Sequence, residues 1–399
     1  MTGNGAPLRT IDTAERRARL AVRHRLAPGW HGANVMEVAR DLVALHATDP
    51  ATVHLSAAAR MTEPSVEAVE RALYDDRVLV RLLGMRRTLF VIPTFLVPVV
   101  HAAATRAVAV NERRRLLGYI AEAGLSEDPA TWYHRVADAT VAALERRGEA
   151  LPGELAADVP ELGLEIRLGE GTRWPATVKV ASRVLTVLAA EERVVRGRPR
   201  GAWTSTGYRW APMSRWLDGE PEQLPVAGAR ASLARRWLAS FGPATAADLK
   251  WWAGWTVAAT RAALAAVVAV VVDVDGTRGY VLPDENEPVA DPEPWVALLP
   301  GLDTTAMGWT GRDWYLDPAL RPALFDRSGN VGPTVWSDGR VVGGWAQRRD
   351  GEVVVRLLAD VGSAVAAEVD ARAAWLTGWL GSARITPRFR TPLERELVA

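Results

Sequence analysis

The chain has 399 residues, enough for about two to four compact units, and 49% of them are hydrophobic, so a large buried core is expected. It contains no cysteine, which excludes disulfides, thiolate metal sites and cysteine nucleophiles and is consistent with a reducing cytoplasm. The formal net charge is only +1, yet every basic residue except Lys179 and Lys250 is an arginine, which fits GC-rich codon use and also suits the binding of phosphates.

The N-terminus, "MTGNGAPLRTIDTAERR", lacks the apolar stretch of a signal peptide, so none is expected. The longest apolar run, "AALAAVVAVVVDVD", is too short to cross a bilayer, and no membrane association is expected.

The first segment, residues 1–125, is predicted to hold three helices and a hairpin. "IDTAERRARLAVRHRLA" predicts an amphipathic helix that Asp12 or Thr13 caps. "NVMEVARDLVALHA" predicts a second helix over 34–47, and "SVEAVERALYDDR" a third over 65–77. "VLVRLLGMRRTLFVIP" indicates two strands around a Gly-Met-Arg-Arg turn.

The next two segments repeat this order. Residues 126–222 predict a helix ended by Gly148, a short helix over 151–160, a third over 172–194 and a hairpin in "RVVRGRPRGAWTSTGYRW". Residues 223–290 predict helices in "AGARASLARRWLASFG", "PATAADLKWWAGW" and "TVAATRAALAAVV", and then a hairpin with Asp-Gly at its turn. The tryptophans Trp251, Trp252 and Trp255 have helical spacing and are expected in the core.

Helix, helix, helix, hairpin is the order of a winged helix. Its threefold recurrence predicts an α+β protein of three tandem winged-helix modules, the alternative being three unrelated small α+β units. A proline-rich and acidic linker follows at about 283–295, and the last part, 291–399, is predicted to be rich in β-strands. Its strands are expected in "WVALLPGLD", "DWYL" and "TVWSDGRVVGGWAQRRDGEVVVRLL", before a helix and the basic tail "RITPRFRTPLER".

The stretch "LVALHATDP", Leu42 to Pro50, places His46, Thr48 and Asp49 within four positions at the expected C-terminus of the second helix. One interpretation is an ordinary helix end and turn, where the dipole favours histidine and Asp-Pro starts a turn. The other is a catalytic cluster. The remaining five histidines have no motif and are expected to be surface or packing residues, and no histidine pair has metal-ligand spacing with a carboxylate, so no metal is expected.

Several phrases together resemble the bacterial winged-helix DNA glycosylases of the AlkZ type. They include "LVALHATDPATVHLSAAAR", "LLGMRRTLFVIP", "RPRGAWTSTGYRWAP", "FGPATAADLKWWAGW", "ALLPGLDTTAMGW" and "GNVGPTVWSDGRVVGGWAQRRDGEV". The resemblance implies a C-shaped monomer around duplex DNA, without cofactor, that excises bulky or alkylated purines, often as self-resistance to a DNA-alkylating natural product. The family's motif is usually Gln-x-Gln or Gln-x-Asp, and here His46 and Thr48 stand at its two positions.

The resemblance implies a chemistry for this cluster. N7- or N3-alkylated purines are cationic leaving groups, so hydrolysis needs a positioned water, a proton acceptor and negative potential near the sugar. His46 would accept the proton, Thr48 would hold the water, and Asp49 would stabilise the cationic sugar. Neither lysine lies near the motif, so a glycosylase without strand cleavage is expected in the cytoplasm, on the nucleoid. The alternatives are a non-catalytic DNA-binding protein, either a transcription regulator or a protein that sequesters lesions or drug, and a protein that binds the genotoxin itself.

Nine residues are predicted to contact DNA from basic turns. Three belong to the first hairpin, three to the second, and three to the C-terminal part: Arg86, Arg87, Thr88, Arg196, Arg198, Arg200, Arg340, Gln347 and Arg348. The alternative is that these turns are charged only for solubility.

Overall fold

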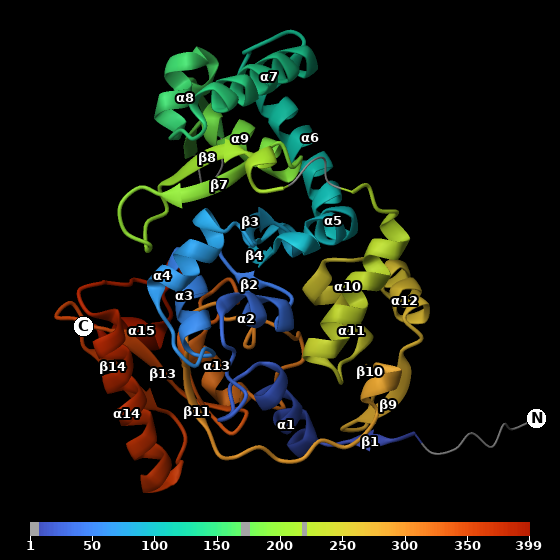
Figure 1. Ribbon diagram of the computed structural model, residues 1–399, viewed down its shortest axis with the longest axis vertical. Helices are drawn as coiled ribbons and strands as arrows, with labels where there is room; N and C mark the ends of the chain where they lie inside the picture. The colour runs from blue at the N-terminus through green and yellow to red at the C-terminus, as the bar shows by residue number, and fades with distance from the viewer. Residues whose placement is uncertain (1–7, 169–175, 218–221) are drawn as a thin grey trace, which may run out of the picture. The chain divides into compact units, whose positions relative to one another are not determined.

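The computed structural model describes residues 8–168, 176–217 and 222–399 (Figure 1). The expectation about a signal peptide rests partly on residues 1–7, which lie outside the described residues. The chain divides into two compact units. Unit 1 comprises Met1–Val69 and Val226–Ala399, and unit 2 comprises Glu70–Pro225. Both units contain helices and strands, so the predicted mixed composition is confirmed.

Unit 1 carries helices from both ends of the chain. They are α1 (Thr13–Arg23), α2 (Val35–Asp41), α3 (Pro50–Ala58), α4 (Val66–Glu70, whose last residue belongs to unit 2), α10 (Val226–Phe241), α11 (Ala246–Ala253), α12 (Val257–Ala266), α13 (Arg321–Leu324), α14 (Gly362–Leu380) and α15 (Pro392–Leu397). Its strands are β1 (Thr10–Ile11), β2 (Leu45–His46), β9 (Val270–Val274), β10 (Thr277–Val281), β11 (Val296–Leu299), β12 (Thr334–Ser337), β13 (Arg340–Gln347) and β14 (Val353–Leu357).

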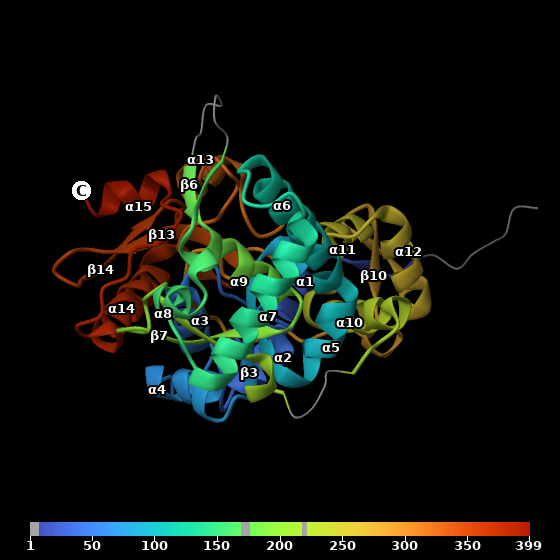
Figure 2. The same ribbon diagram turned by 90° about the horizontal axis from the view of Figure 1, so that it is seen from above.

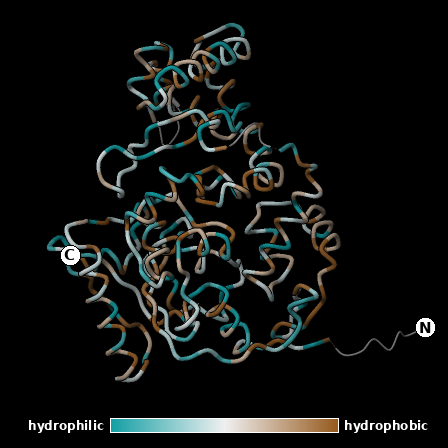
Figure 3. Tube along the Cα trace, viewed as in Figure 1, coloured by the Kyte–Doolittle hydropathy of each residue, from teal (hydrophilic) through white to brown (hydrophobic). Residues whose placement is uncertain are grey.

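Polar side chains at helix starts explain where several of these helices begin. The side chain of Asp12 accepts a hydrogen bond from Glu15 N at 2.9 Å, so the predicted cap of α1 is confirmed. Asn34 caps α2 in the same way, and Thr245 forms a reciprocal pair with Asp248 at the start of α11. Hydrophobic and hydrophilic residues alternate along the helices (Figure 3), as expected where one face is buried.

The second predicted helix is shorter than expected. It ends at Asp41 rather than at residue 47, and Val43 adopts a left-handed conformation with φ of 66° before β2 begins. The apolar run from Leu42 to Leu45 is fully buried, and a short, fully buried run has no period that separates strand from helix. Similarly, "DWYL", Asp313–Leu316, forms a turn and not the predicted strand.

Residues 226–281 follow the predicted order of three helices and a hairpin. Asp275 and Gly276 both have positive φ, as the predicted two-residue turn between β9 and β10 requires. β1 pairs with β9 in parallel and adds Ile11 to the small apolar core of this sheet. In α11 and the turn after it, Trp252 and Trp255 are buried as predicted, whereas Trp251 is half-buried under the guanidinium of Arg312.

The C-terminal part contains a four-stranded antiparallel sheet in the order β11-β12-β13-β14, so the strands predicted here, apart from "DWYL", are confirmed. Figure 2 shows α14 and α15 on opposite sides of β13 and β14. The chain between α14 and α15, together with α15 itself, forms the C-terminal tail, residues 381–399.

Unit 2 has its own core. Its helices are α5 (Val97–Val100), α6 (Arg106–Glu122), α7 (Pro129–Arg147), α8 (Pro152–Asp158) and α9 (Val180–Ala190), with π-helical turns at Arg71–Asp75 and His101–Thr105. Its strands are β3 (Leu79–Leu83), β4 (Leu89–Pro93), β5 (Glu165–Leu168), β6 (Ala176–Lys179), β7 (Val194–Pro199) and β8 (Tyr208–Pro212). The hairpins β3–β4 and β7–β8 and the end of α7 at Gly148, with φ of 80°, agree with the sequence.

Two parts of unit 2 differ from the prediction. The helix expected over 172–194 is confined to Val180–Ala190, because 176–179 form β6; residues 172–175 lie outside the described residues. The helical segment Thr94–Glu122 was not predicted, and by length and composition alone it is apolar enough to cross a membrane. Leu96, Val97 and Val100 of this segment are fully buried, so part of its apolar surface is covered within the protein.

Candidate functional site

The predicted motif lies on a short turn between β2 and α3, which we call the motif turn (His46–Asp49). His46 is the second residue of β2, and Asp49 immediately precedes α3. His46 is only 5% exposed, whereas Thr48 and Asp49 are half-buried. The segment therefore ends a strand and starts a helix, and the expectation that it ends a helix was wrong. Its three polar residues still lie on one turn.

Two backbone N–H groups fix the carboxylate of Asp49. Its Oδ1 accepts from Ala51 N at 3.0 Å, which makes Asp49 the cap of α3. Its Oδ2 accepts from Arg388 N at 3.0 Å, in the C-terminal tail. A carboxylate here also lies at the positive end of the helix dipole. Asp49 thus places a negative charge at a defined position between α3 and the tail.

The loop after β11 supports the motif turn from behind. Thr304 Oγ1 accepts a hydrogen bond from His46 N at 3.2 Å and donates one to Ala44 O at 2.9 Å. In α3, Thr52 Oγ1 donates to Gly301 O at 2.8 Å. The strand before the turn and the helix after it are therefore both tied to residues 301–304, so the turn has little freedom to move.

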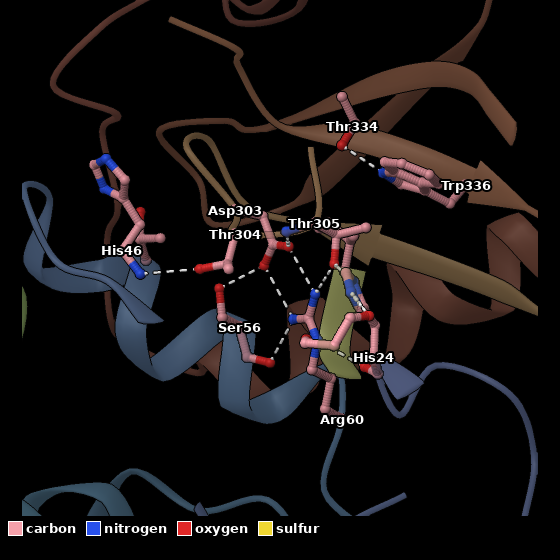
Figure 4. A network of polar contacts seen from close by, with 12 residues as sticks. His24, His46, Ser56, Arg60, Asp303, Thr304, Thr305, Thr334 and Trp336 are labelled. Atoms are coloured by element: carbon pink, nitrogen blue, oxygen red, sulfur yellow. Dashed lines mark hydrogen bonds and ion pairs between the residues drawn. The ribbon is translucent and has the colours of Figure 1, made fainter. Parts of the chain in front are cut away.

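A fully buried ion pair holds this supporting loop in place (Figure 4). Arg60 donates to both carboxylate oxygens of Asp303, at 2.6 and 3.0 Å, and Ser56 Oγ donates to Oδ2 at 2.6 Å. Burial alone would raise the pKa of Asp303, but the charge of Arg60 and the hydrogen bonds to the carboxylate outweigh it and lower that pKa. In Figure 4 the imidazole of His46 points away from this network.

His24 closes the same network and is kept neutral. Burial, together with the charge of Arg60, lowers the pKa of His24 to about 3. Its Nε2 lies 3.2 Å from Ser240 O, a carbonyl that only accepts, so the proton is assigned to Nε2. Nδ1 then accepts from the hydroxyl of Thr305 at 2.7 Å, and that hydroxyl accepts from Arg60. His24 is therefore a packing residue, as expected from the sequence.

The first basic turn is partly neutralised within unit 2. Arg86 and Arg87 both have positive φ, in the tight turn between β3 and β4. The exposed guanidinium of Arg87 pairs with the buried carboxylate of Glu112 at 2.7 Å. Thr88 is half-buried, and its backbone closes the turn through Gly84 and Met85.

The second basic turn presents its three arginines differently. Arg196 is half-buried over the ring of Trp210, and burial, followed by the charge of Arg81, lowers its pKa to about 10. Arg198 is exposed but pairs with Asp75 at 2.8 Å and lies 3.7 Å from Glu70. Arg200 is exposed, and among the described residues its side chain has no ion-pair partner. Arg200 is therefore the member of this turn most available to an external anion.

The three predicted DNA contacts of the C-terminal part also differ in how far their side chains are available to an external anion. Arg340 is exposed at the start of β13. Gln347 is buried, and its amide is used internally: Nε2 donates to Gly351 O and Ala383 O, both at 3.1 Å, and Oε1 accepts from Ile385 N at 2.8 Å. A direct contact of Gln347 with DNA would break these bonds. Arg348 is exposed and pairs with Glu352 at 3.0 Å.

The sequence did not single out Arg60, Asp303, Thr304 or Arg388 as residues of the site. The available signal was an arginine and an aspartate inside otherwise apolar phrases, "SAAAR" and "GLDTT", because a charge in a buried run needs a partner. Among the described residues, no three histidine, aspartate or glutamate side chains come together as a possible metal site. The expectation of no metal stays a prediction.

Comparison with known proteins gives three findings. The family model described as DNA glycosylase AlkZ-like matches residues 39–379. An interstrand DNA cross-link repair glycosylase from Streptomyces sahachiroi is 33% identical over 120 residues, which are 29% of this chain and 32% of that relative. The solved structure of the Streptomyces sahachiroi DNA glycosylase AlkZ matches with a TM-score of 0.72 at 20% identity, over 95% of this chain and 99% of that one. The structural match shows a shared fold.

Proposed function

The chain belongs to the AlkZ-like DNA glycosylase family, and from that premise we propose that it hydrolyses the N-glycosidic bond of bulky or N7- or N3-alkylated purines in duplex DNA. The observation that carries this proposal is the motif turn, where His46, Thr48 and Asp49 follow one another closely, the backbone of His46 is anchored to Thr304, and Asp49 is anchored to Arg388. Rigid placement of polar groups is what a hydrolytic site requires.

The proposed reaction begins with the departure of the cationic base. The C1′–N bond breaks and its electron pair passes to the purine. The sugar that remains is an oxocarbenium ion. Asp49 stabilises this positive charge, because its carboxylate is held in place by two backbone N–H groups. Water then attacks C1′ while neutral His46 accepts its proton, and the Thr48 hydroxyl orients that water.

We propose that no covalent enzyme–DNA intermediate forms. A Schiff base needs a lysine or terminal amine near the sugar, and the two lysines are exposed on β6 and α11, far along the chain from the motif turn. The products would be a free base and an intact strand with an abasic site.

The DNA would be held by winged-helix modules. The set α10, α11, α12, β9 and β10 has the helix–helix–helix–hairpin order, and α7, α8, α9, β7 and β8 have the same order with the β5–β6 pair inserted. We retain 1–125, 126–222, 223–290 and 291–399 as proposed module boundaries. A monomer acting on the nucleoid in the cytoplasm is part of the proposal, as is self-resistance to a DNA-alkylating natural product.

The test is incubation of the protein with a panel of duplexes that carry N7- and N3-alkylated or bulky purine adducts. We expect release of the modified base and abasic sites in uncleaved strands, and no protein–DNA species trapped by borohydride. Tight binding to every duplex without base release would contradict catalysis and favour the non-catalytic DNA-binding alternative. A trapped complex that depends on Lys179 or Lys250 would contradict the attack by water.

A further inference from the structure

A hollow of about 500 Å³ lies between the β13–β14 turn and the C-terminal tail. We call it the arginine hollow, because five arginines line it: Arg348, Arg349, Arg384, Arg390 and Arg395. Among the described residues that line it, Glu394 is the one acidic side chain. None of the predicted DNA contacts except Arg348 and Gln347 belongs to this hollow, so most of its positive charge was not anticipated from the sequence.

Three of the five guanidinium groups have no carboxylate side chain within ion-pair distance among the described residues. Arg390 pairs with Glu394 at 2.7 Å and Arg348 with Glu352 at 3.0 Å. Arg384 donates instead to four backbone carbonyls, of Arg349, Asp350, Gly381 and Ala383, at 2.7 to 3.1 Å. Arg349 and Arg395 are exposed. The described side chains that line the hollow therefore carry more positive than negative charge.

The two walls of the hollow are fixed to each other. Arg384 bonds to the β13–β14 turn through Arg349 O and Asp350 O. Buried Gln347 adds a second link, since its amide bonds to Gly351 in the turn and to Ala383 and Ile385 in the tail. Like charges brought together on a preorganised surface repel one another, and a bound anion relieves that repulsion. Gln347 thus has a positioning role here, and the direct DNA contact predicted from the sequence would require these bonds to break.

The tail that lines the hollow also contacts the motif turn. Arg388, between Arg384 and Arg390 in the sequence, donates its backbone N–H to Asp49 Oδ2 at 3.0 Å. The same short segment of chain therefore carries arginines of the hollow and holds the carboxylate of Asp49, which would face the sugar.

We propose that the arginine hollow binds phosphates of the DNA backbone and so sets the register of the strand on the motif turn. Guanidinium groups match phosphate oxygens with two parallel hydrogen bonds, which suits a phosphodiester better than a weakly hydrogen-bonding anion. The inference rests on the proposed function only in taking DNA as the anion.

The test compares the variant Arg349→Gln/Arg395→Gln with wild type in binding to an undamaged duplex. Both side chains are exposed and unpaired with acids among the described residues, so the fold should be unaffected, which melting temperatures would check. Each lost phosphate contact lowers the salt slope of log K by roughly 0.9, so the double variant should lose about tenfold less affinity than wild type between 50 and 200 mM salt. Arg349→Lys/Arg395→Lys keeps both charges and should keep the wild-type slope.

The matched control is Arg235→Gln/Arg372→Gln. It removes the same charge from unit 1, but at exposed Arg235 and half-buried Arg372, which pair with Asp284 and Glu368. If wild type and Arg349→Gln/Arg395→Gln have equal slopes, the hollow does not bind the backbone, although DNA can remain the substrate. An equal fall in the control would also overturn the assignment, because any two charges would then suffice. No duplex binding by wild type even at low salt would overturn both this inference and the proposed function.

Discussion

His46 is the residue whose removal should affect base excision most. In the proposed mechanism it accepts the proton of the attacking water, whereas the carboxylate of Asp49 stabilises the cationic sugar. General-base assistance is typically worth a factor of ~10² to 10⁴, or about 3–5 kcal/mol of barrier. We expect His46→Ala to lose excision by such a factor in single-turnover assays on an alkylated duplex, while duplex affinity stays close to that of wild type.

His46→Gln serves as the control for this variant. Glutamine restores the family's usual residue and can orient a water, but it cannot take up a proton. We expect partial activity, because the amide can still hold the water in position for attack. Excision by His46→Ala as fast as by wild type would mean that the histidine only packs behind the turn.

Asp49 combines a structural and an electrostatic role, and Asp49→Asn should separate them. The amide oxygen can still cap α3, but the –NH₂ group cannot accept from Arg388 N, and the negative charge is lost. We expect a marked fall in the single-turnover rate, with a loss of unfolding free energy of about 1 kcal/mol. Thr48→Ala removes one hydroxyl and no charge, so its rate should fall less. A slower Thr48→Ala than Asp49→Asn would contradict these roles.

His24 should make the stability of unit 1 sensitive to pH. In the folded protein the pKa of His24 is about 3, below the ordinary value of 6.5. Below pH 6.5 His24 is therefore protonated in the unfolded chain but stays neutral in the folded protein. The stabilisation is therefore complete above pH 6.5 and is lost as the pH falls from 6.5 toward 3. Between pH 7 and pH 5 this group alone should cost about 2 kcal/mol of unfolding free energy.

The measurement is denaturant unfolding of wild type and His24→Gln at both pH values. The pKa of His31 is also lowered, chiefly by burial. Because wild type and His24→Gln both contain His31, the difference between their pH dependences of stability reports on His24 alone. The pKa of Asp303 is lowered as well. The stabilisation that Asp303 contributes is present above the pKa that its carboxyl has in the unfolded chain, and it is lost only below about pH 4. Equal pH sensitivity in the two proteins would contradict the neutral, buried His24.

At the scale of elements, Thr304 ties β2 to the loop after β11, and its hydroxyl is the link to test. Thr304→Val has nearly the same shape but can neither accept from His46 N nor donate to Ala44 O. We expect a loss of about 1–3 kcal/mol in unfolding free energy and a lower excision rate with unchanged duplex affinity. Thr334→Val removes a different buried hydroxyl, the partner of Trp336 Nε1, and should lower stability without affecting the rate. Equal rates for both variants would leave Thr304 without a positioning role.

The elements with local signals were predictable from the sequence. Helices that begin at a side-chain cap, such as α1 at Asp12 and α12 at Thr256, and hairpins with a turn signal, such as Asp275-Gly276, begin and turn where the sequence indicates. These signals act within about four residues, so no knowledge of the tertiary structure is needed to recognise them.

The elements without an exposed face were not predictable. Every residue of α3 is buried, so the helix has no exposed polar face with the 3.6-residue period by which an amphipathic helix is recognised. Residues 42–45 are buried as well, so the sequence did not show that α2 ends at Asp41 and that His46 belongs to β2. The Arg60–Asp303 pair joins residues 243 positions apart, and no local pattern specifies such a contact. The sequence thus indicated the residues of the motif turn, whose catalytic role stays a prediction, but it did not indicate the groups that position them.

At the scale of the whole molecule, the near-neutral net charge does not show which arginines are paired within the protein. Many are neutralised internally, among them Arg60, Arg87 and Arg198. A net charge of +1 is therefore compatible with DNA binding if other arginines, such as Arg200 in unit 2 and Arg349 and Arg395 in unit 1, are available to phosphates.

The salt dependence of DNA affinity, measured for variants of single arginines, should distinguish arginines that bind phosphates from those that are paired within the protein. Phosphate contacts carry no sequence information, so Arg200→Gln should weaken binding to all duplexes alike and reduce the slope of log K against log salt by roughly 0.9. Arg135→Gln is the matched variant in unit 2, since Arg135 is exposed but pairs with Glu161 at 2.6 Å, and its slope should equal that of wild type. A loss confined to one sequence in Arg200→Gln would indicate a base contact instead of a phosphate contact. Equal slopes for Arg200→Gln and wild type would remove the second basic turn from the DNA-binding surface and leave phosphate binding to other arginines.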